Sequence, residues 1–217
     1  MSTEDVQAFY GQWARAYDWL CRLLPGVQRL RRAAVAALEI DAGDTVVDLG
    51  CGTGANLALL RERVGPDGAV VGVDLTRGML GVAARRVERH GWENVHLVRG
   101  DAARPPVDGV DAVLGSFVVG LLADPGAAVE RWVDRVVPGG RVAVLEAGRS
   151  RHPHARHLNW AFDEFVAAGA PSGGRDAPSR TLDDRIEAAR DALAENASLT
   201  RDERRAAGFV RVFAADV

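Results

Sequence analysis

A strand-like segment that runs directly into closely spaced glycines is the feature that most constrains the fold of this chain. The segment Val46–Leu49 leads into Gly50-Cys-Gly-Thr-Gly54. Glycines at alternate positions let the backbone turn sharply and let a ligand approach where a Cβ atom would collide. A helix that follows such a turn presents unpaired N–H groups and the positive end of its dipole. The sequence therefore predicts a strand, a ligand-binding loop and a helix, in that order.

Short runs of β-branched residues alternate with helical stretches from residue 45 onward, which is typical of a parallel sheet with crossover helices on both faces. The expected strands are Thr45–Leu49, Ala69–Asp74, Val95–Arg99, Asp111–Ser116 and Arg141–Glu146. The expected helices are Ala55–Val64, Arg77–Arg89 and Pro125–Val137, which end at the breakers Gly65-Pro66, Gly91 and Pro138-Gly139-Gly140. We therefore predict an α/β fold with a doubly wound, mostly parallel sheet.

Composition excludes several other classes of protein. With 217 residues, 47% hydrophobic and a net charge of −3, the chain has the size of one soluble domain and lacks the positive field that binding to nucleic acid needs. No apolar stretch approaches the about 20 residues that span a bilayer, and the first residues lack a signal-peptide pattern, so we expect a cytoplasmic protein. Cys21 and Cys51 do not form a C-x-x-C pair, which argues against a zinc or redox site.

Carboxylates accompany three consecutive expected strands. Asp48 precedes the first glycine by two residues, where it would repel a pyrophosphate and attract a ligand that carries ammonium and sulfonium charges. Asp74 ends the second strand, where its two oxygens can accept from both hydroxyls of a ribose. Asp101 follows the third strand and can accept from the exocyclic amine of an adenine, or can instead cap the turn Asp-Ala-Ala. The three acids indicate a positively charged nucleoside ligand.

The glycines alone leave a second class of enzyme open. Gly50-x-Gly52-x-x-Ala55, with Asp74 about 20 residues further on, also satisfies the dinucleotide-binding pattern. A nicotinamide-dependent oxidoreductase is therefore an alternative, although Asp48 and the later Asp101 argue against it.

The chain resembles the class I S-adenosylmethionine-dependent methyltransferases in four segments that occur in the same order: Asp48–Gly54, Val73-Asp74, Gly100-Asp101-Ala102 and Pro138-Gly139-Gly140. The resemblance implies a Rossmann-like fold with S-adenosyl-L-methionine as cofactor. It also implies that Asp48 and the loop of Gly50, Cys51, Gly52 and Gly54 hold the methionine part, Asp74 the ribose, and Asp101 with Ala102 the adenine, whose pocket Leu75 and Met79 would line. A module that binds this cofactor without transferring a methyl group would have the same motifs and is a third hypothesis.

A weaker similarity extends to the acceptor. Tyr17-Asp18, Leu145-Glu146, the helix expected over Thr181–Ala194 and Ala207-Gly208-Phe209 resemble the ubiquinone/menaquinone-biosynthesis branch and the phospholipid N-methyltransferases. This resemblance implies a small-molecule or lipid-like acceptor, with at most peripheral contact to a membrane. We accordingly expect one domain over residues 1–217, with a helical cap at 4–40, a cofactor-binding core at 41–146, and an acceptor-side and C-terminal segment at 147–217.

Candidate acceptor residues lie in three places. Tyr10 and Tyr17 belong to an aromatic stripe on the first of two helices expected over residues 4–40, which either packs on the sheet or closes over the site. Phe117 follows the fourth strand. Glu146 ends the fifth strand, and His152, His154 and His157 follow it, with His154 as the hypothetical base beside Glu146. These histidines lack helical i, i+4 spacing, so we expect no metal site.

Two further expectations concern the ends of the chain. Thr181 with Asp184, and Thr200 with Glu203, match capping boxes that would open two helices, followed by one last strand at Phe209–Ala214 and no seventh strand. An open sheet edge there would allow pairing with a second copy as a homodimer. Near the other end, four arginines form a basic helix face that is either solvated or directed at lipid headgroups: Arg22, Arg29, Arg31 and Arg32.

Overall fold

The computed structural model describes residues 26–169 and 178–217, with side chains except at 165–169 and 178–180. Its helices are α2 (Val27–Ala37), α3 (Leu57–Val64), α4 (Arg77–His90), α5 (Pro125–Val133), α6 (Asn159–Gly169) and α7 (Pro178–Asn196), with short helices η1 (Val119–Leu121), η2 (Arg156–Leu158) and η3 (Ala206–Gly208). Its strands are β1 (Thr45–Leu49), β2 (Ala69–Asp74), β3 (Val95–Arg99), β4 (Val110–Ser116), β5 (Val136–Ala147), β6 (Ser198–Arg205) and β7 (Val210–Asp216).

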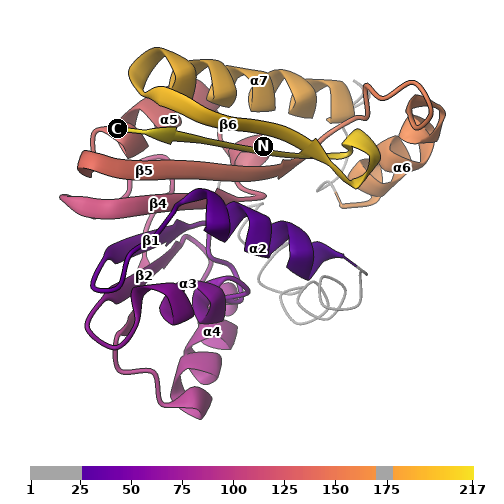
Figure 1. The fold of residues 1–217 in the computed structure, drawn as a ribbon. Helices are drawn as coiled ribbons and strands as arrows, with labels where there is room; N and C mark the ends of the chain where they lie inside the picture. Colours follow the sequence, from indigo (N-terminus) through magenta and orange to yellow (C-terminus); the bar gives the residue numbers. More distant parts are fainter. Residues whose placement is uncertain (1–25, 170–177) are drawn as a thin grey trace.

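All of these strands belong to one sheet in the order β3-β2-β1-β4-β5-β7-β6, as Figure 1 shows. β1 to β5 are parallel, and β7 is antiparallel to both of its neighbours. The predicted doubly wound, mostly parallel sheet is confirmed. Because β2 lies on one side of β1 and β4 on the other, the winding reverses at β1, and ligands of such folds bind beyond the carboxyl ends of the strands at that reversal.

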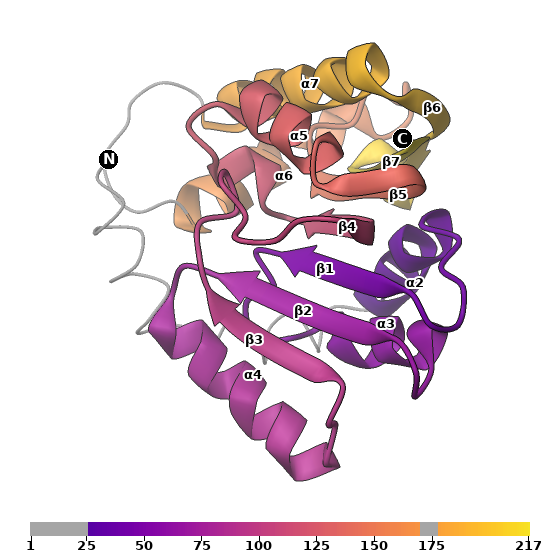
Figure 2. The ribbon, with the colours of Figure 1, turned by 90° about the vertical axis from the view of Figure 1, so that its left-hand side faces the viewer.

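Helices cover both faces of the sheet (Figure 2). On one face α2, α3 and α4 contribute apolar side chains such as Val35, Leu57 and Ala83 to a continuous core. On the other face α5 and α7 pack around the fully buried Trp132 and Phe213. Strands that are covered on both sides are almost continuously apolar, which is why the central strands are rich in valine.

The second helix expected over residues 4–40 is present as α2, whereas the first lies outside the described residues. α2 crosses β4, β5 and β7 on the same face of the sheet as α3. No helix in the described part of the chain is long and apolar enough to cross a membrane.

The prediction of a helix from Thr200 is wrong. Ser198–Arg205 is the edge strand β6, and β7 lies between it and β5, so the sheet has the seventh strand that we did not expect. Threonine followed by glutamate three residues later fits a capping box, but alternation between more and less exposed side chains along this segment fits an edge strand equally well. The edge strand on this side of the sheet is therefore β6, not the strand expected at Phe209–Ala214.

Helix boundaries also differ from the prediction, most of all in α5 and α7. α5 ends at Val133 instead of Val137, because Val136 already pairs with Val110 of β4 and Pro138-Gly139-Gly140 lies inside the irregular start of β5. α7 begins at Pro178, so Thr181 lies within the helix instead of capping it. Proline is favoured in the first turn because its missing N–H would have no helical partner there.

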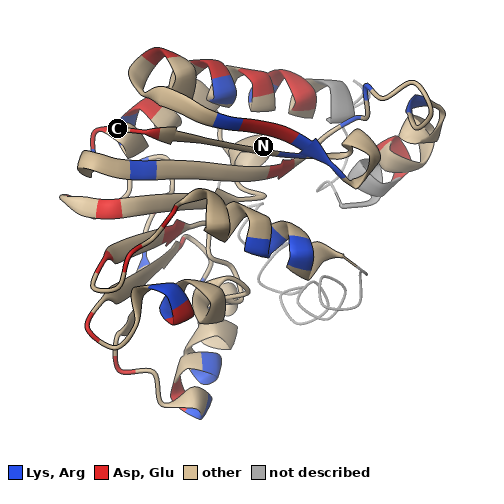
Figure 3. Cartoon of the chain, viewed as in Figure 1, with Lys and Arg blue, Asp and Glu red and all other residues tan. Residues whose placement is uncertain are grey.

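Ion pairs attach the C-terminal hairpin to α7, and Figure 3 shows the alternating charges along β6 beneath the acidic residues of that helix. Arg211 of β7, which is 10% exposed, contacts Glu187 of α7 at 2.7 Å and makes two 2.8 Å hydrogen bonds to Asp202 of β6. Arg151 and Arg204 approach the same Glu187 at 2.8 and 3.4 Å. The small pocket at this place includes three arginines in its lining, and neighbouring acids balance their charges.

We expect Arg211→Ala to lower the free energy of unfolding by about 2 kcal/mol, because it removes the hydrogen bonds of one buried guanidinium, while Arg151 and Arg204 still face Glu187 and Arg190 still faces Asp202. Arg201→Ala is the matched control. Arg201 lies on the same hairpin but is 31% exposed and 3.6 Å from Glu203, so its loss should cost less than about 1 kcal/mol. Urea unfolding of the two variants measures the difference, and equal costs would mean that the network does not hold the hairpin in place.

Candidate functional site

The loop between β1 and α3 has the backbone that its glycines predict. Gly50, Gly52 and Gly54 have φ angles of 67°, 56° and 77°, a region that other residues adopt rarely. A Cβ atom on Gly50 would lie 2.6 Å from a methyl group of Val118, which follows β4. The loop is therefore packed closely against the neighbouring crossover, at the point where the winding of the sheet reverses.

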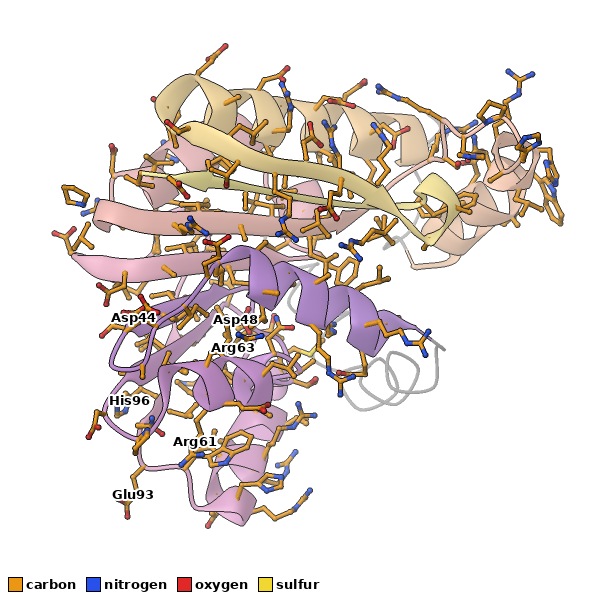
Figure 4. The ribbon with its side chains drawn as sticks, in the orientation of Figure 1. Asp44, Asp48, Arg61, Arg63, Glu93 and His96 are labelled. Atoms are coloured by element: carbon orange, nitrogen blue, oxygen red, sulfur yellow. The ribbon has the colours of Figure 1, made fainter. Side chains whose placement is uncertain are left out.

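Asp48 is the penultimate residue of β1. Figure 4 shows it inside the molecule, away from the amino ends of the strands, where Asp44, Glu93 and His96 lie. Its side chain is fully buried, and Asn56 Nδ2 donates to its Oδ1 at 3.0 Å. Its Oδ2 is buried and has no hydrogen-bond partner among the described residues. Burial raises the pKa of Asp48 to about 7, against the opposing effects of the Asn56 hydrogen bond and the Arg31 charge.

Two polar side chains that we did not predict complete the surroundings of Asp48. Asn56, just before α3, also donates to Ser116 Oγ at 3.3 Å and accepts from Arg31 Nη1 at 2.8 Å. Arg31 is 6% exposed, and its guanidinium lies 5.3 Å from the ring centre of Phe117. The prediction of a solvated basic face on α2 is therefore wrong for Arg31.

A signal for the burial of Arg31 was present in the sequence. Arg31 shares a helical stripe with Ala34, Val35 and Leu38, at spacings of three, four and seven residues, and all of these are buried. An arginine within an apolar stripe faces the core, where it needs a hydrogen-bond partner.

Asp74 organises the glycine loop from the neighbouring strand. At the end of β2, its Oδ2 accepts from Gly52 N at 2.9 Å and its Oδ1 accepts from Thr76 N at 2.8 Å. Burial raises the pKa of Asp74, and these two backbone donors oppose the shift. Nearby, Leu75 is half-buried, while Met79 of α4 and Cys51 are buried. The residues implied to hold the methionine and ribose parts therefore meet at one edge of the sheet.

The third predicted acid lies at the same edge but is exposed. Asp101 Oδ1 accepts from Ala103 N at 2.9 Å, which is the turn-capping role that we left open beside a contact with adenine. Ala102 is buried, and its carbonyl accepts from the indole N–H of Trp132 at 2.7 Å. α5 thereby fixes the backbone after β3.

Glu146 is buried near the end of β5. Its Oε2 accepts from Gly120 N and its Oε1 from Ala147 N, each at 3.3 Å. Burial raises its pKa to about 7, and backbone donors of η1 lower it. Phe117 follows β4 just before η1, has a φ angle of 56°, and donates its backbone N–H to Leu145 O at 2.7 Å. Such a conformation is costly for a phenylalanine and is most often found at functional sites.

The histidine segment follows β5 and lies on the surface. His152, His154 and His157 are exposed, and the first two rings are 5.5 Å apart. Within the described ranges, no three His, Cys, Asp or Glu side chains are grouped as metal ligands would be. Tyr10 and Tyr17, the remaining predicted acceptor contacts, lie outside the described residues.

The edge formed by the glycine loop, Asp48 and Asp74 suits a small cationic ligand with hydroxyl groups. A buried carboxylate oxygen without a partner attracts positive charge, and close backbone without side chains leaves room for a ligand. A pyrophosphate at the glycine loop would face the carboxylate of Asp48, which argues against a dinucleotide.

Comparison with known proteins agrees with this geometry. Residues 46–140 match the family described as methyltransferase domain. The chain is 38% identical to aklanonic acid methyltransferase DauC of Streptomyces over 64% of each protein, and thus spans less than two thirds of that relative. It is 30% identical to 2-phytyl-1,4-naphtoquinone methyltransferase of Thermosynechococcus vestitus over 76% of this chain and 75% of that one. Among solved structures, a methyltransferase of Aquifex aeolicus has a TM-score of 0.68 at 18% identity, covering 94% and 97% of the two chains, and shares the fold.

We expect the effect of Glu146→Gln on stability to become more favourable as the pH rises above neutrality. The pKa of Glu146 rises from 4.5 in the unfolded chain to about 7 in the fold, so stability falls as the pH rises between these values. The glutamine variant lacks this pH dependence, although its NH₂ group loses one of the two backbone hydrogen bonds at every pH, so its stability relative to the wild type should be about 1–3 kcal/mol more favourable at pH 8 than at pH 4. Thermal unfolding at the two pH values tests this, with the exposed Glu130→Gln as control. A pH-independent effect would contradict it.

Proposed function

The chain belongs to the class I S-adenosylmethionine-dependent methyltransferases, and we propose that it transfers the methyl group of S-adenosylmethionine to a small, lipid-like acceptor. The observation that carries the proposal is the buried Asp48, whose second oxygen has no partner among the described residues. A cationic cofactor supplies the charge that this oxygen lacks.

The proposal assigns the parts of the cofactor to the groups at the sheet edge. Asp48 and the backbone of Gly50–Gly54 would hold the methionine part, and Asp74 would accept from the ribose hydroxyls. Asp101, Ala102, Leu75 and Met79 would surround the adenine. In support, Asp74 already holds Gly52 N and Thr76 N, so that its position is fixed before a ligand arrives.

The chemistry demands alignment more than a reactive side chain. When bound, S-adenosylmethionine supplies a methyl group on a sulfonium, which a nucleophilic atom of the acceptor displaces in line. The protein's part is to hold the two reactants, exclude water and, for an acidic acceptor, take up a proton. We propose that His154 or Glu146 takes up this proton. Glu146 lies near the carboxyl end of β5 and has a pKa raised to about 7, and His154 lies in the segment that follows this strand.

For the acceptor, we propose a quinone-precursor or phospholipid type. A relative whose name states a naphtoquinone substrate aligns with 76% of this chain. Apolar side chains suit such a molecule. Phe117 offers one in the loop after β4, next in sequence to Val118, which packs against Gly50 of the glycine loop. His152 and His157 would contact its polar end, and Tyr10 and Tyr17 would cover it.

Asp74→Ala should weaken the binding of S-adenosylmethionine and S-adenosylhomocysteine at least about tenfold, because two hydroxyl hydrogen bonds to a charged group are lost. Isothermal titration calorimetry measures this, with Asp67→Ala as control, since Asp67 is an exposed acid at the opposite end of β2. NADH should not bind. Binding of NADH in place of the two sulfur compounds would favour the oxidoreductase alternative, and binding without turnover of any acceptor class would favour the non-catalytic module.

Replacing His152, His154 and His157 together by alanine should lower turnover about 10²–10⁴-fold if one of them takes the acceptor proton, with the affinity for S-adenosylhomocysteine unchanged. The measurement is transfer of labelled methyl to demethylated naphthoquinones and phosphatidylethanolamine. His96→Ala is the control, because His96 is exposed at the amino end of β3 (Figure 4). Undiminished turnover in the triple variant would rule out a histidine base and leave Glu146.

A further inference from the structure

Arg31 is a buried cation whose nearest hydrogen-bond partner is an amide. Its Nη1 donates to Asn56 Oδ1 at 2.8 Å, and only 6% of the residue is exposed. Burial of a guanidinium is costly unless a hydrogen-bond acceptor and a nearby negative charge compensate it. The acceptor is Asn56, and the nearby negative charge is Asp48.

Asn56 connects the two charges in a fixed direction. With its Oδ1 turned towards Arg31, its Nδ2 must face the opposite way, where it donates to Asp48 Oδ1 at 3.0 Å and to Ser116 Oγ at 3.3 Å. An amide held by an arginine on one side cannot flip, because its NH₂ group would then face the guanidinium. Asp48 Oδ1 is thereby occupied, and the buried Oδ2 has no hydrogen-bond partner among the described residues.

Arg31 also acts on the charge of Asp48 over a longer distance. Desolvation is the largest influence on the pKa of Asp48 and raises it, whereas the Asn56 hydrogen bond and the Arg31 charge lower it and the Asp74 charge raises it. Facing charges thus come from α2 and β2, and the buried thiol of Cys51 lies beside them with its own pKa raised by burial. Arg31 is the cation among these groups.

We infer that Arg31 is a positioning residue of the cofactor site: through Asn56 it fixes the orientation of Asp48, and its positive charge favours the carboxylate form that the cationic part of the cofactor requires. The inference rests on the proposed function. It makes α2, which precedes the glycine motif and lies outside the residues matched to the family, a part of the cofactor site.

The proton balance of cofactor binding distinguishes this role from a structural one. With a pKa of about 7, Asp48 is half protonated at pH 7, and binding of a cation should release about half a proton. If loss of the Arg31 charge raises this pKa by about one unit, about nine tenths is protonated, proton release approaches about one, and affinity falls about fivefold. At pH 8.5 the affinities of the two proteins should converge.

The experiment is calorimetric titration with S-adenosylhomocysteine, which is stable over this pH range and keeps the ammonium group. Proton release is obtained at pH 7 from buffers of different ionisation enthalpy, and affinity is followed from pH 6 to 8.5. The proteins are wild type, Arg31→Gln, Arg31→Lys and the control Arg32→Gln, which removes the same charge from an exposed position on the same helix. Arg31→Lys retains the charge and should release protons like wild type.

Each outcome has a defined meaning. Greater proton release and pH-dependent weakening in Arg31→Gln, with Arg32→Gln unchanged, support the inference. Equal weakening of Arg31→Gln at every pH with unchanged proton release, or identical behaviour of the Arg31 and Arg32 variants, overturns it. Absence of binding to the wild type refutes the proposed function instead. If thermal unfolding shows that Arg31→Gln is not folded, the comparison of Arg31→Lys with wild type decides: greater proton release by the lysine variant would contradict the inference.

Discussion

Helices cover both faces of the parallel sheet, and the other features of this molecule depend on the resulting burial of its strands. A strand buried on both sides has no place for polar chemistry along its length, so carboxylates occur where strands end, at Asp48, Asp74 and Glu146. The same burial that excludes water there raises the pKa of each of the three. Buried carboxylates are thus gathered at the carboxyl ends of the strands, where a ligand of positive charge would stabilise their ionised form.

Local patterns were sufficient to predict the parallel half of the fold. Valine-rich runs and glycine breakers located β1 to β5, because each strand is specified by its own burial. The glycine loop could be predicted equally well, because its backbone adopts positive φ angles that glycine accommodates and other residues rarely adopt. Local patterns failed at Ser198–Arg205, where a polar edge strand depends on its partner β7 and its sequence also fits the start of a helix.

The candidate site was predictable at its carboxylates and less so in the groups that orient them. Asp48 and Asp74 could be assigned because they have fixed places beside the glycines. Asn56 and Arg31 could not, because their roles depend on the packing of α2 across the sheet, which brings together residues separated by 25 positions. Glu146 was predicted as a participant in catalysis, and the structure adds that the N–H groups of η1 and Ala147 hold its carboxylate in place.

The position of β7 has a consequence for how the chain folds during synthesis. β7 comprises residues 210–216 and is inserted between β5 and β6. Until β7 has been synthesised, β5 therefore lacks its antiparallel neighbour, and β6 lacks the strand with which it pairs in the finished sheet. An unpaired strand edge favours association with other chains. The sheet is therefore completed only after β7 has been made, and until then other contacts must cover the unpaired edge of β5.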